Sequence, residues 1–172
     1  MKVIEAIGKI EASKEYGKWL KQNPSAYLAH AFTMKEGEGF ESWQVGYYNP
    51  EHNKVTVFEL DDKVQMMPES EVFKKDETAV KALDRQKIKL DVEDALKAAL
   101  VLNQEKYPQI RSDKQIIVLQ NLDEGQVWNI TFISQSMDVL NIKLDSAEGT
   151  VVSHNLSRIF EFKNFDDSPP AA

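Results

Sequence analysis

The sequence predicts an α+β protein of two tandem repeats, each an N-terminal helix packed on a curved antiparallel sheet of three to four strands. Two observations carry this prediction. Apolar residues recur three and four positions apart ahead of Pro24 and again ahead of Pro108, as on one face of a helix. After each proline the pattern changes to the alternation of period two that is typical of strands. The chain of 172 residues has room for two small units, which would gain stability by packing on each other.

The first repeat opens with a helix predicted over residues 2–22. Pro24 ends it, because the residue before a proline is pushed out of the helical region. Alternating stretches then predict strands, at 26–34, 43–48, 55–60 and 64–67. Glycine, asparagine, proline and aspartate separate these stretches, in a charged loop at 35–41, a turn at 49–53 and a tight turn at 61–63.

The second repeat follows the same plan. Asp91 is a candidate N-cap for a helix that ends near Tyr107 and Pro108. Strands are predicted at 114–121, 126–134, 139–145 and 150–153. A last apolar segment, 156–162, is compatible with either a helix or a strand.

The chain therefore divides into four parts. They are a first repeat at 1–73, a charged connector at 74–89 with a short helical turn around 79–83, a second repeat at 90–163, and a flexible polar tail at 164–172. Laid over each other, the halves match residues 43–48 with 127–132 and residues 55–61 with 139–145.

The second half carries the helix residues LDVEDALKAAL, the strand QVWNITF and the hairpin NIKLDSAEGTVVS. Over residues 90–153 it resembles the PepSY-like family, small α+β modules of protease propeptides and of bacterial and archaeal proteins. Asp145, Gly149, Val151 and Val152 fill the places of that family's closing hairpin. The first half lacks the glycine and resembles a diverged copy. The resemblance implies a cystatin-like outline and inhibitory or ligand-binding roles, since the family is not generally catalytic.

The composition disfavours or excludes several classes of function. The chain has 28 acidic against 21 basic residues and a net charge of −7, which disfavours nucleic-acid binding because that needs clustered cations. It has no cysteine, which excludes disulfides, thiolate zinc sites and cysteine nucleophiles. Charges interrupt the N-terminal apolar residues, and no stretch reaches the ~20 apolar residues of a membrane span. These patterns predict a cytoplasmic protein without a membrane partner.

The sequence contains no pattern of residues that is typical of a catalytic, cofactor-binding or metal-binding site. His30, His52 and His154 lack a second ligand at helical spacing, and Asp145 with Glu148 is typical of a hairpin turn. We therefore expect no catalytic, cofactor-binding or metal-binding residues, and no cofactor.

Aromatic residues gather on the predicted strands of the first half, and they form the candidate interaction face: Tyr27, Phe32, Trp43, Tyr47 and Tyr48. Alternation places Trp43 and Tyr47 on one side of the sheet and Tyr48 on the other. One side must pack the helix, so these residues are either core or an exposed contact face.

The leading hypothesis is a non-catalytic module that binds a protein or peptide through an open sheet face or an edge strand, as a monomer or homodimer. Two alternatives stay open. One is a peptidase-inhibitor-like protein. The other is a small hydrolase or lyase with a pocket between the repeats, using carboxylates and a histidine such as His154.

Overall fold

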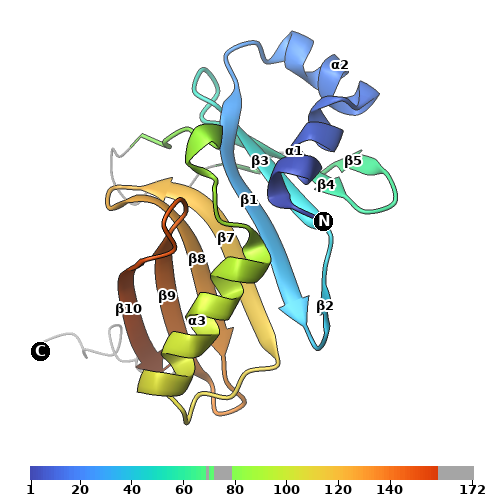
Figure 1. Ribbon diagram of the computed structural model, residues 1–172. Coiled ribbons are helices and arrows are strands. Elements are labelled where there is room, and N and C mark those ends of the chain that lie inside the picture. Colours follow the sequence, from blue (N-terminus) through green and yellow to red (C-terminus); the bar gives the residue numbers. More distant parts are fainter. Residues whose placement is uncertain (69, 72–78, 159–172) are drawn as a thin grey trace, which may run out of the picture.

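The structure is a computed structural model that describes residues 1–68, 70–71 and 79–158. In these residues the chain is an α+β protein, with helices on one face of a ten-stranded antiparallel sheet (Figure 1). The helices are α1 (Val3–Glu11), α2 (Lys14–Gln22) and α3 (Val92–Lys106), and a 3₁₀ turn spans Arg85–Lys87. The strands of the first half are β1 (Tyr27–Glu36), β2 (Gly39–Phe40), β3 (Trp43–Asn49), β4 (Lys54–Leu60), β5 (Val64–Met66) and β6 (Ser70–Glu71). Those of the second half are β7 (Lys114–Leu122), β8 (Gly125–Ile133), β9 (Asp138–Asp145) and β10 (Val151–Arg158).

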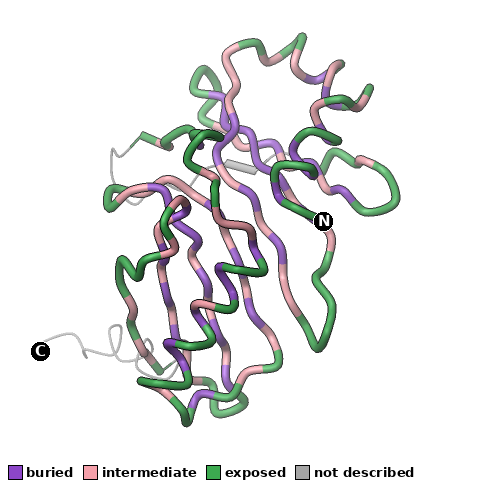
Figure 2. The backbone as a smooth tube through the Cα atoms, viewed as in Figure 1, coloured by how far each residue is buried: buried purple, intermediate pink, exposed green. Residues whose placement is uncertain are grey.

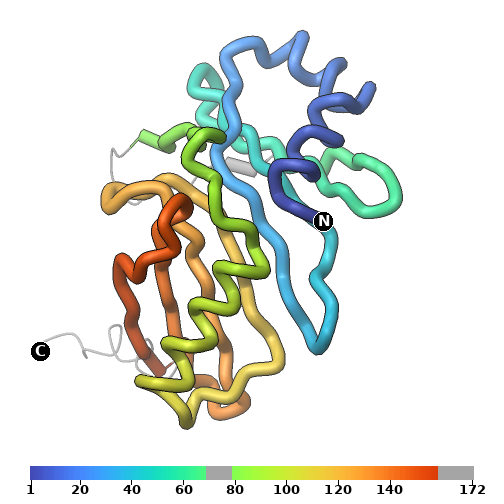
Figure 3. Tube along the Cα trace, in the orientation of Figure 1, coloured from blue at the N-terminus to red at the C-terminus, as the bar shows by residue number. Residues whose placement is uncertain are grey.

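The strand order is mirrored about the centre of the sheet. It runs β10-β9-β8-β7-β1-β3-β4-β5, while β2 pairs with β1 and β6 with β4. Each half is a meander, and its first strand after the helix lies at the centre. The two halves therefore share one continuous sheet, and they occupy its two sides in the colour-ramped trace (Figure 3).

The β1–β7 pair, which we call the seam, joins the halves. Its register places Thr33 opposite Ile117 and Phe32 opposite Val118. Thr33 and Ile117 are fully buried on the side of the sheet that carries the helices. Successive side chains alternate between faces, so Phe32 and Val118 lie on the other side.

The single helix expected over residues 2–22 is wrong, because it is two helices. The break falls at Ala12 and Ser13, and the Ser13 hydroxyl accepts a hydrogen bond from the Tyr16 backbone N–H at 3.1 Å. No large apolar residue stands between Ile10 and Tyr16, so nothing on the buried face holds a continuous helix across the gap. The expected end before Pro24 is confirmed, since α2 ends at Gln22.

The N-cap and end of the second predicted helix are confirmed. Asp91 caps α3 by accepting a hydrogen bond from the Val92 backbone N–H at 2.9 Å. The helix ends at Lys106 with Tyr107 as its C-cap, directly before Pro108.

The connector differs from its prediction. Residues 79–83 are not helical, and the 3₁₀ turn comes later, at Arg85–Lys87, where Asp84 supplies the N-cap. Two side chains of the second half fix this segment. The Gln126 amide pairs with the backbone N–H and carbonyl of Asp84, at 2.7 and 3.1 Å. The buried Ser146 hydroxyl donates to the Lys87 carbonyl at 2.9 Å.

The same segment also contacts the first half. The Arg85 guanidinium forms an ion pair with Glu11 at the end of α1. Tyr47 on β3 donates its hydroxyl to the same carboxylate at 3.1 Å. Burial, followed by the charge of Glu11, raises the pKa of Tyr47, which keeps this phenol protonated as a donor.

The expected glycine hairpin between β9 and β10 is confirmed. Gly149 has φ of 72° and donates its backbone N–H to the Asp145 carbonyl at 2.9 Å. The segment from Leu156 is extended as far as Arg158, within β10. Residues 159–162, the predicted tail at 164–172 and part of the predicted connector, 72–78, lie outside the described residues.

Two tryptophans meet above the seam on the helix-covered side. The rings of Trp43 on β3 and Trp128 on β8 lie 6.4 Å apart between centroids. Each indole N–H donates to the carbonyl that precedes an N-cap, Trp43 to Met1 at 3.1 Å and Trp128 to Leu90 at 3.0 Å. Each tryptophan therefore fixes the start of the helix in its own half.

This geometry corrects part of the expected alignment of the halves. Matching Trp43 with Val127 is wrong, because the residue of β8 that faces the helices as Trp43 does is Trp128. A shift of one residue moves every side chain of a strand to the opposite face. In the other matched stretch, 55–61 with 139–145, the equivalent residues Phe58 and Ile142 are both fully buried in the shared core.

Candidate functional site: the open sheet face

The candidate site is the face of the sheet opposite the helices, which we call the open face. On the helix-covered face, α1 packs against β3 and β4, and α3 packs against β8 and β9. Buried residues alternate with partly exposed ones over residues 115–120 of β7, 128–133 of β8 and 140–145 of β9, and Figure 2 shows the two classes along these strands. The partly exposed residues point to the open face, over which no helix among the described residues lies.

The centre of the open face is apolar. Four side chains from the seam strands meet there in two cross-strand pairs, Phe32 with Val118 and Met34 with Ile116. Each is partly exposed. Apolar side chains on a face without a covering layer are the usual core of a protein contact.

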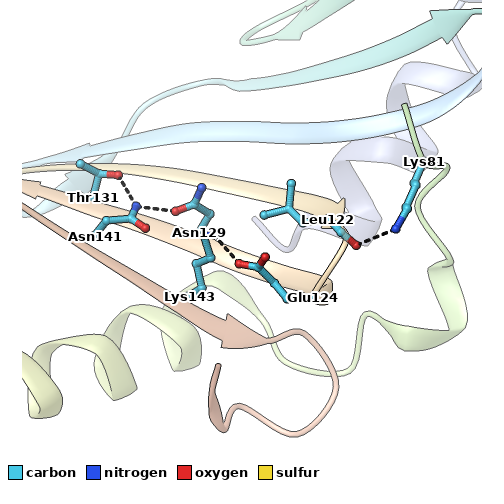
Figure 4. A network of polar contacts seen from close by, with 7 residues as sticks. All are labelled: Lys81, Leu122, Glu124, Asn129, Thr131, Asn141 and Lys143. Atoms are coloured by element: carbon cyan, nitrogen blue, oxygen red, sulfur yellow. Dashed lines mark hydrogen bonds and ion pairs between the residues drawn. The ribbon is translucent and has the colours of Figure 1, made fainter. Parts of the chain in front are cut away.

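Polar groups border this apolar centre on the side of the second half, where Asn129 pairs with Val118 across β7 and β8. The Asn141 amide donates to Asn129 at 2.6 Å and to the Thr131 hydroxyl at 3.0 Å (Figure 4). Lys143 forms an ion pair with Glu124. Donors and acceptors are thus held in fixed positions across β8 and β9.

A second polar border lies on β3 and β4. Glu59 accepts hydrogen bonds from the Ser42 hydroxyl at 2.7 Å and from the Gln44 amide at 3.4 Å. Gln44 is paired with Phe32 across β1 and β3, so this border directly adjoins the apolar centre. The open face therefore has an apolar middle between two polar margins.

The connector limits the face at one end. Tyr27 donates its hydroxyl to the Val80 carbonyl at 2.6 Å and packs edge-to-face on Tyr48, with 5.6 Å between ring centroids. Lys81 donates to the Leu122 carbonyl at 3.2 Å, beside the polar border of β8 and β9 (Figure 4).

The five aromatic residues predicted as an interaction face do not form one exposed surface. Trp43 and Tyr47 are buried under the helices, where Tyr47 contacts the rings of Tyr16 and Phe58. Tyr48 lies on the other side, as alternation predicts, but it is buried too and donates to Asn53 at 2.9 Å. Tyr27 supports the connector. Of the five, Phe32 alone belongs to the apolar centre, because the large rings are used to pack the helices and the connector.

Sequence reasoning missed Met34, Ile116 and Val118, the other members of the apolar centre. A pattern in the sequence could have indicated two of them: the run Ile116-Ile117-Val118-Leu119 is apolar on both faces of a strand. A half-exposed strand normally alternates, so a two-sided apolar run indicates that both faces of that strand are in contact with something.

His30 lies on the open face above a glycine. It pairs with Gly46 across β1 and β3, and its imidazole rests on that residue, where a Cβ would lie 2.1 Å from the ring. Glycine is therefore required for this close approach. Burial lowers the pKa of His30, so the ring is neutral at physiological pH.

We expect the protein to lose stability as the pH falls below about 6.5, and His30 to contribute to that loss. Its pKa is lower in the fold than in the unfolded chain, so the unfolded chain binds more protons over this range. The His30→Gln variant should show a smaller drop in the free energy of unfolding between pH 7 and pH 5. Urea titrations at both pH values measure this, with exposed His52→Gln as control. An unchanged drop in His30→Gln contradicts the expectation.

The other two histidines lie apart. His52 is exposed in the turn between β3 and β4. His154 on β10 forms a hydrogen bond with the Tyr107 hydroxyl at 2.6 Å and approaches Lys106 at 3.4 Å. Within residues 1–68, 70–71 and 79–158, no three His, Cys, Asp or Glu side chains are grouped so as to hold a metal ion.

Comparison with known proteins gives one similar structure. No family model matches the chain, and no curated protein matches it. A crystal structure of a putative lipoprotein from Clostridium difficile 630 has a TM-score of 0.54 and 15% sequence identity, and the match covers 87% of this chain and 94% of that one. At this identity the similarity shows the fold. No helix in the described part of the chain is long and apolar enough to cross a membrane.

Proposed function

We propose that the chain is a tandem pair of PepSY-like units and serves as a non-catalytic protein-binding module that contacts its partner through the open face. The mirrored strand order supports the tandem pair. The matching bonds from Trp43 to Met1 and from Trp128 to Leu90 support it further, since each half uses a core tryptophan to fix its helix start.

The observation that carries the binding function is the apolar centre between two polar margins. Stable protein interfaces have an apolar core with a polar rim, and the open face has that arrangement across the seam. Phe32 and Val118 lie at its middle, with Gln44 on one side and Asn129 on the other. The partner that fits is a folded protein whose contact surface has an apolar patch surrounded by hydrogen-bonding groups.

Substitution at the centre of the face tests this function. Val118→Glu is expected to reduce partner recovery at least about tenfold, because a carboxylate there would be desolvated without a counter-charge. The matched control is Val101→Glu, at an exposed valine of α3 on the far side of the sheet. Tagged wild type and both variants are compared in pull-downs from the source cell after circular dichroism shows that they fold.

A photo-crosslinking residue at each of the two positions gives an independent readout. A partner crosslinked from position 118 and not from 101 supports the open face. Equal recovery by Val118→Glu and wild type contradicts it. The cytoplasmic location expected from the sequence stays a prediction, which fractionation of the source cell would test.

A further inference from the structure

The outer edge of β10 is a long strand edge without a partner among the described residues. β10 runs over Val151–Arg158 and pairs on one side with β9. At the opposite end of the sheet, β5 and β6 have only three and two residues. The sheet therefore ends in two short strands on one side and in an eight-residue strand on the other.

The middle of this edge carries none of the usual protection. Exposed edge strands are normally guarded by prolines, by charged side chains or by bulges, because their free N–H and C=O groups attract other strands. In β10 a register shift is confined to the start, between Val151 and Ser153, and the one arginine is at the end, at Arg158. From Ser153 to Ser157 the strand has no proline, lysine, arginine or acidic residue.

The sequence of β10 is compatible with antiparallel pairing to itself. Around a twofold axis at Asn155, Ser153 lies opposite Ser157, and His154 lies opposite Leu156. No like charges then face each other, which would destabilise adjacent strands. Asn155 is exposed, so it is available at such an axis.

The seam is already an antiparallel strand pairing that joins two meanders. There, β1 and β7 pair antiparallel and unite two meanders of the same order into one sheet. Pairing of two β10 strands would repeat that arrangement between two chains, at the other end of the second meander.

We propose that two copies of this chain associate through antiparallel pairing of their β10 strands, centred on Asn155. The contact is one strand edge from each copy, so we expect weak association, with a dissociation constant on the order of 10–100 µM. This contact uses the edge of the sheet and leaves the open face accessible.

Substitutions that introduce a positive or a negative charge at position 155 test the proposal with the full-length chain. Sedimentation velocity over a concentration series should show wild type shifting toward a dimer. Asn155→Lys and Asn155→Asp should each raise the dissociation constant about fivefold to tenfold, because each places like charges opposite each other. An equimolar mixture of the two variants should recover the wild-type shift. Gln135→Lys and Gln135→Asp, in the exposed turn between β8 and β9, should leave it unchanged.

Several results would overturn the proposal. One is a wild type that stays monomeric at several hundred micromolar. Another is dimerisation of both Asn155 variants with wild-type strength. A third is a mixture that stays as weak as the separate variants. Because Asn155 is exposed and outside the core, circular dichroism should show folded variants in every case.

Discussion

Replacing Trp128 with alanine is expected to lower the free energy of unfolding by about 3–5 kcal/mol, the range for large buried aromatic residues. Trp128 is fully buried, contacts Trp43 above the seam and donates to the carbonyl that precedes the N-cap of α3. The variant therefore loses packing at the junction of the halves and the bond that fixes the start of α3. Urea denaturation followed by circular dichroism measures the change.

Trp19 provides a matched control for this effect. Trp19 is also buried, but its indole nitrogen has no hydrogen-bond partner among the described residues. Trp128→Phe should therefore cost about 1–2 kcal/mol more than Trp19→Phe, because it leaves the Leu90 carbonyl unpaired as well as removing volume. Equal costs would mean that the indole hydrogen bond contributes nothing to the anchoring of α3.

Replacing Gln126 with alanine is expected to lower the free energy of unfolding by about 2–4 kcal/mol, since it removes three hydrogen bonds of about 1 kcal/mol each. The Gln126 amide pairs with both backbone groups of Asp84 and donates to the Ser146 hydroxyl at 3.1 Å. No other described side chain bonds to the N–H of Asp84. Loss of this contact should release the segment that leads into the 3₁₀ turn and α3.

Hydrogen exchange separates this local effect from a general loss of stability. Relative to wild type, Gln126→Ala should speed the exchange of the Asp84 amide more than that of the amides in the middle of β8, under conditions where the protein stays folded. The control is Gln120→Ala on β7. Gln120 is partly exposed, so this substitution should change the free energy of unfolding by no more than about 0.5 kcal/mol. Uniformly faster exchange across the sheet in Gln126→Ala would contradict a role specific to the connector.

Local features of the fold were predictable because they depend on neighbouring residues. The Asp91 cap, the helix end before Pro108 and the glycine turn at Gly149 each follow from a side chain or backbone preference within a few positions. The break at Ser13 was missed because the apolar period alone does not show whether a helix continues across a polar gap. The one-residue error that matched Trp43 with Val127 and not with Trp128 has a similar cause, since alternation sets which residues share a face but not which face is buried.

The candidate site depended on information that alternation does not contain. The sequence does not show that β1 pairs with β7, so it could not place Phe32 beside Val118. It also could not assign the aromatic residues, because Tyr47 under the helices and Tyr48 on the other face have the same local pattern. The pairing of distant strands determined both outcomes.

The seam has a consequence for the order in which the sheet assembles. Its paired residues lie 78 to 90 positions apart, whereas the strands inside each meander pair residues at most 21 positions apart. Closing a loop about four times longer costs roughly 1.2 kcal/mol more in chain entropy. The local hairpins therefore have a kinetic advantage, and the halves are expected to dock along Thr33 and Ile117 after their own strands have paired.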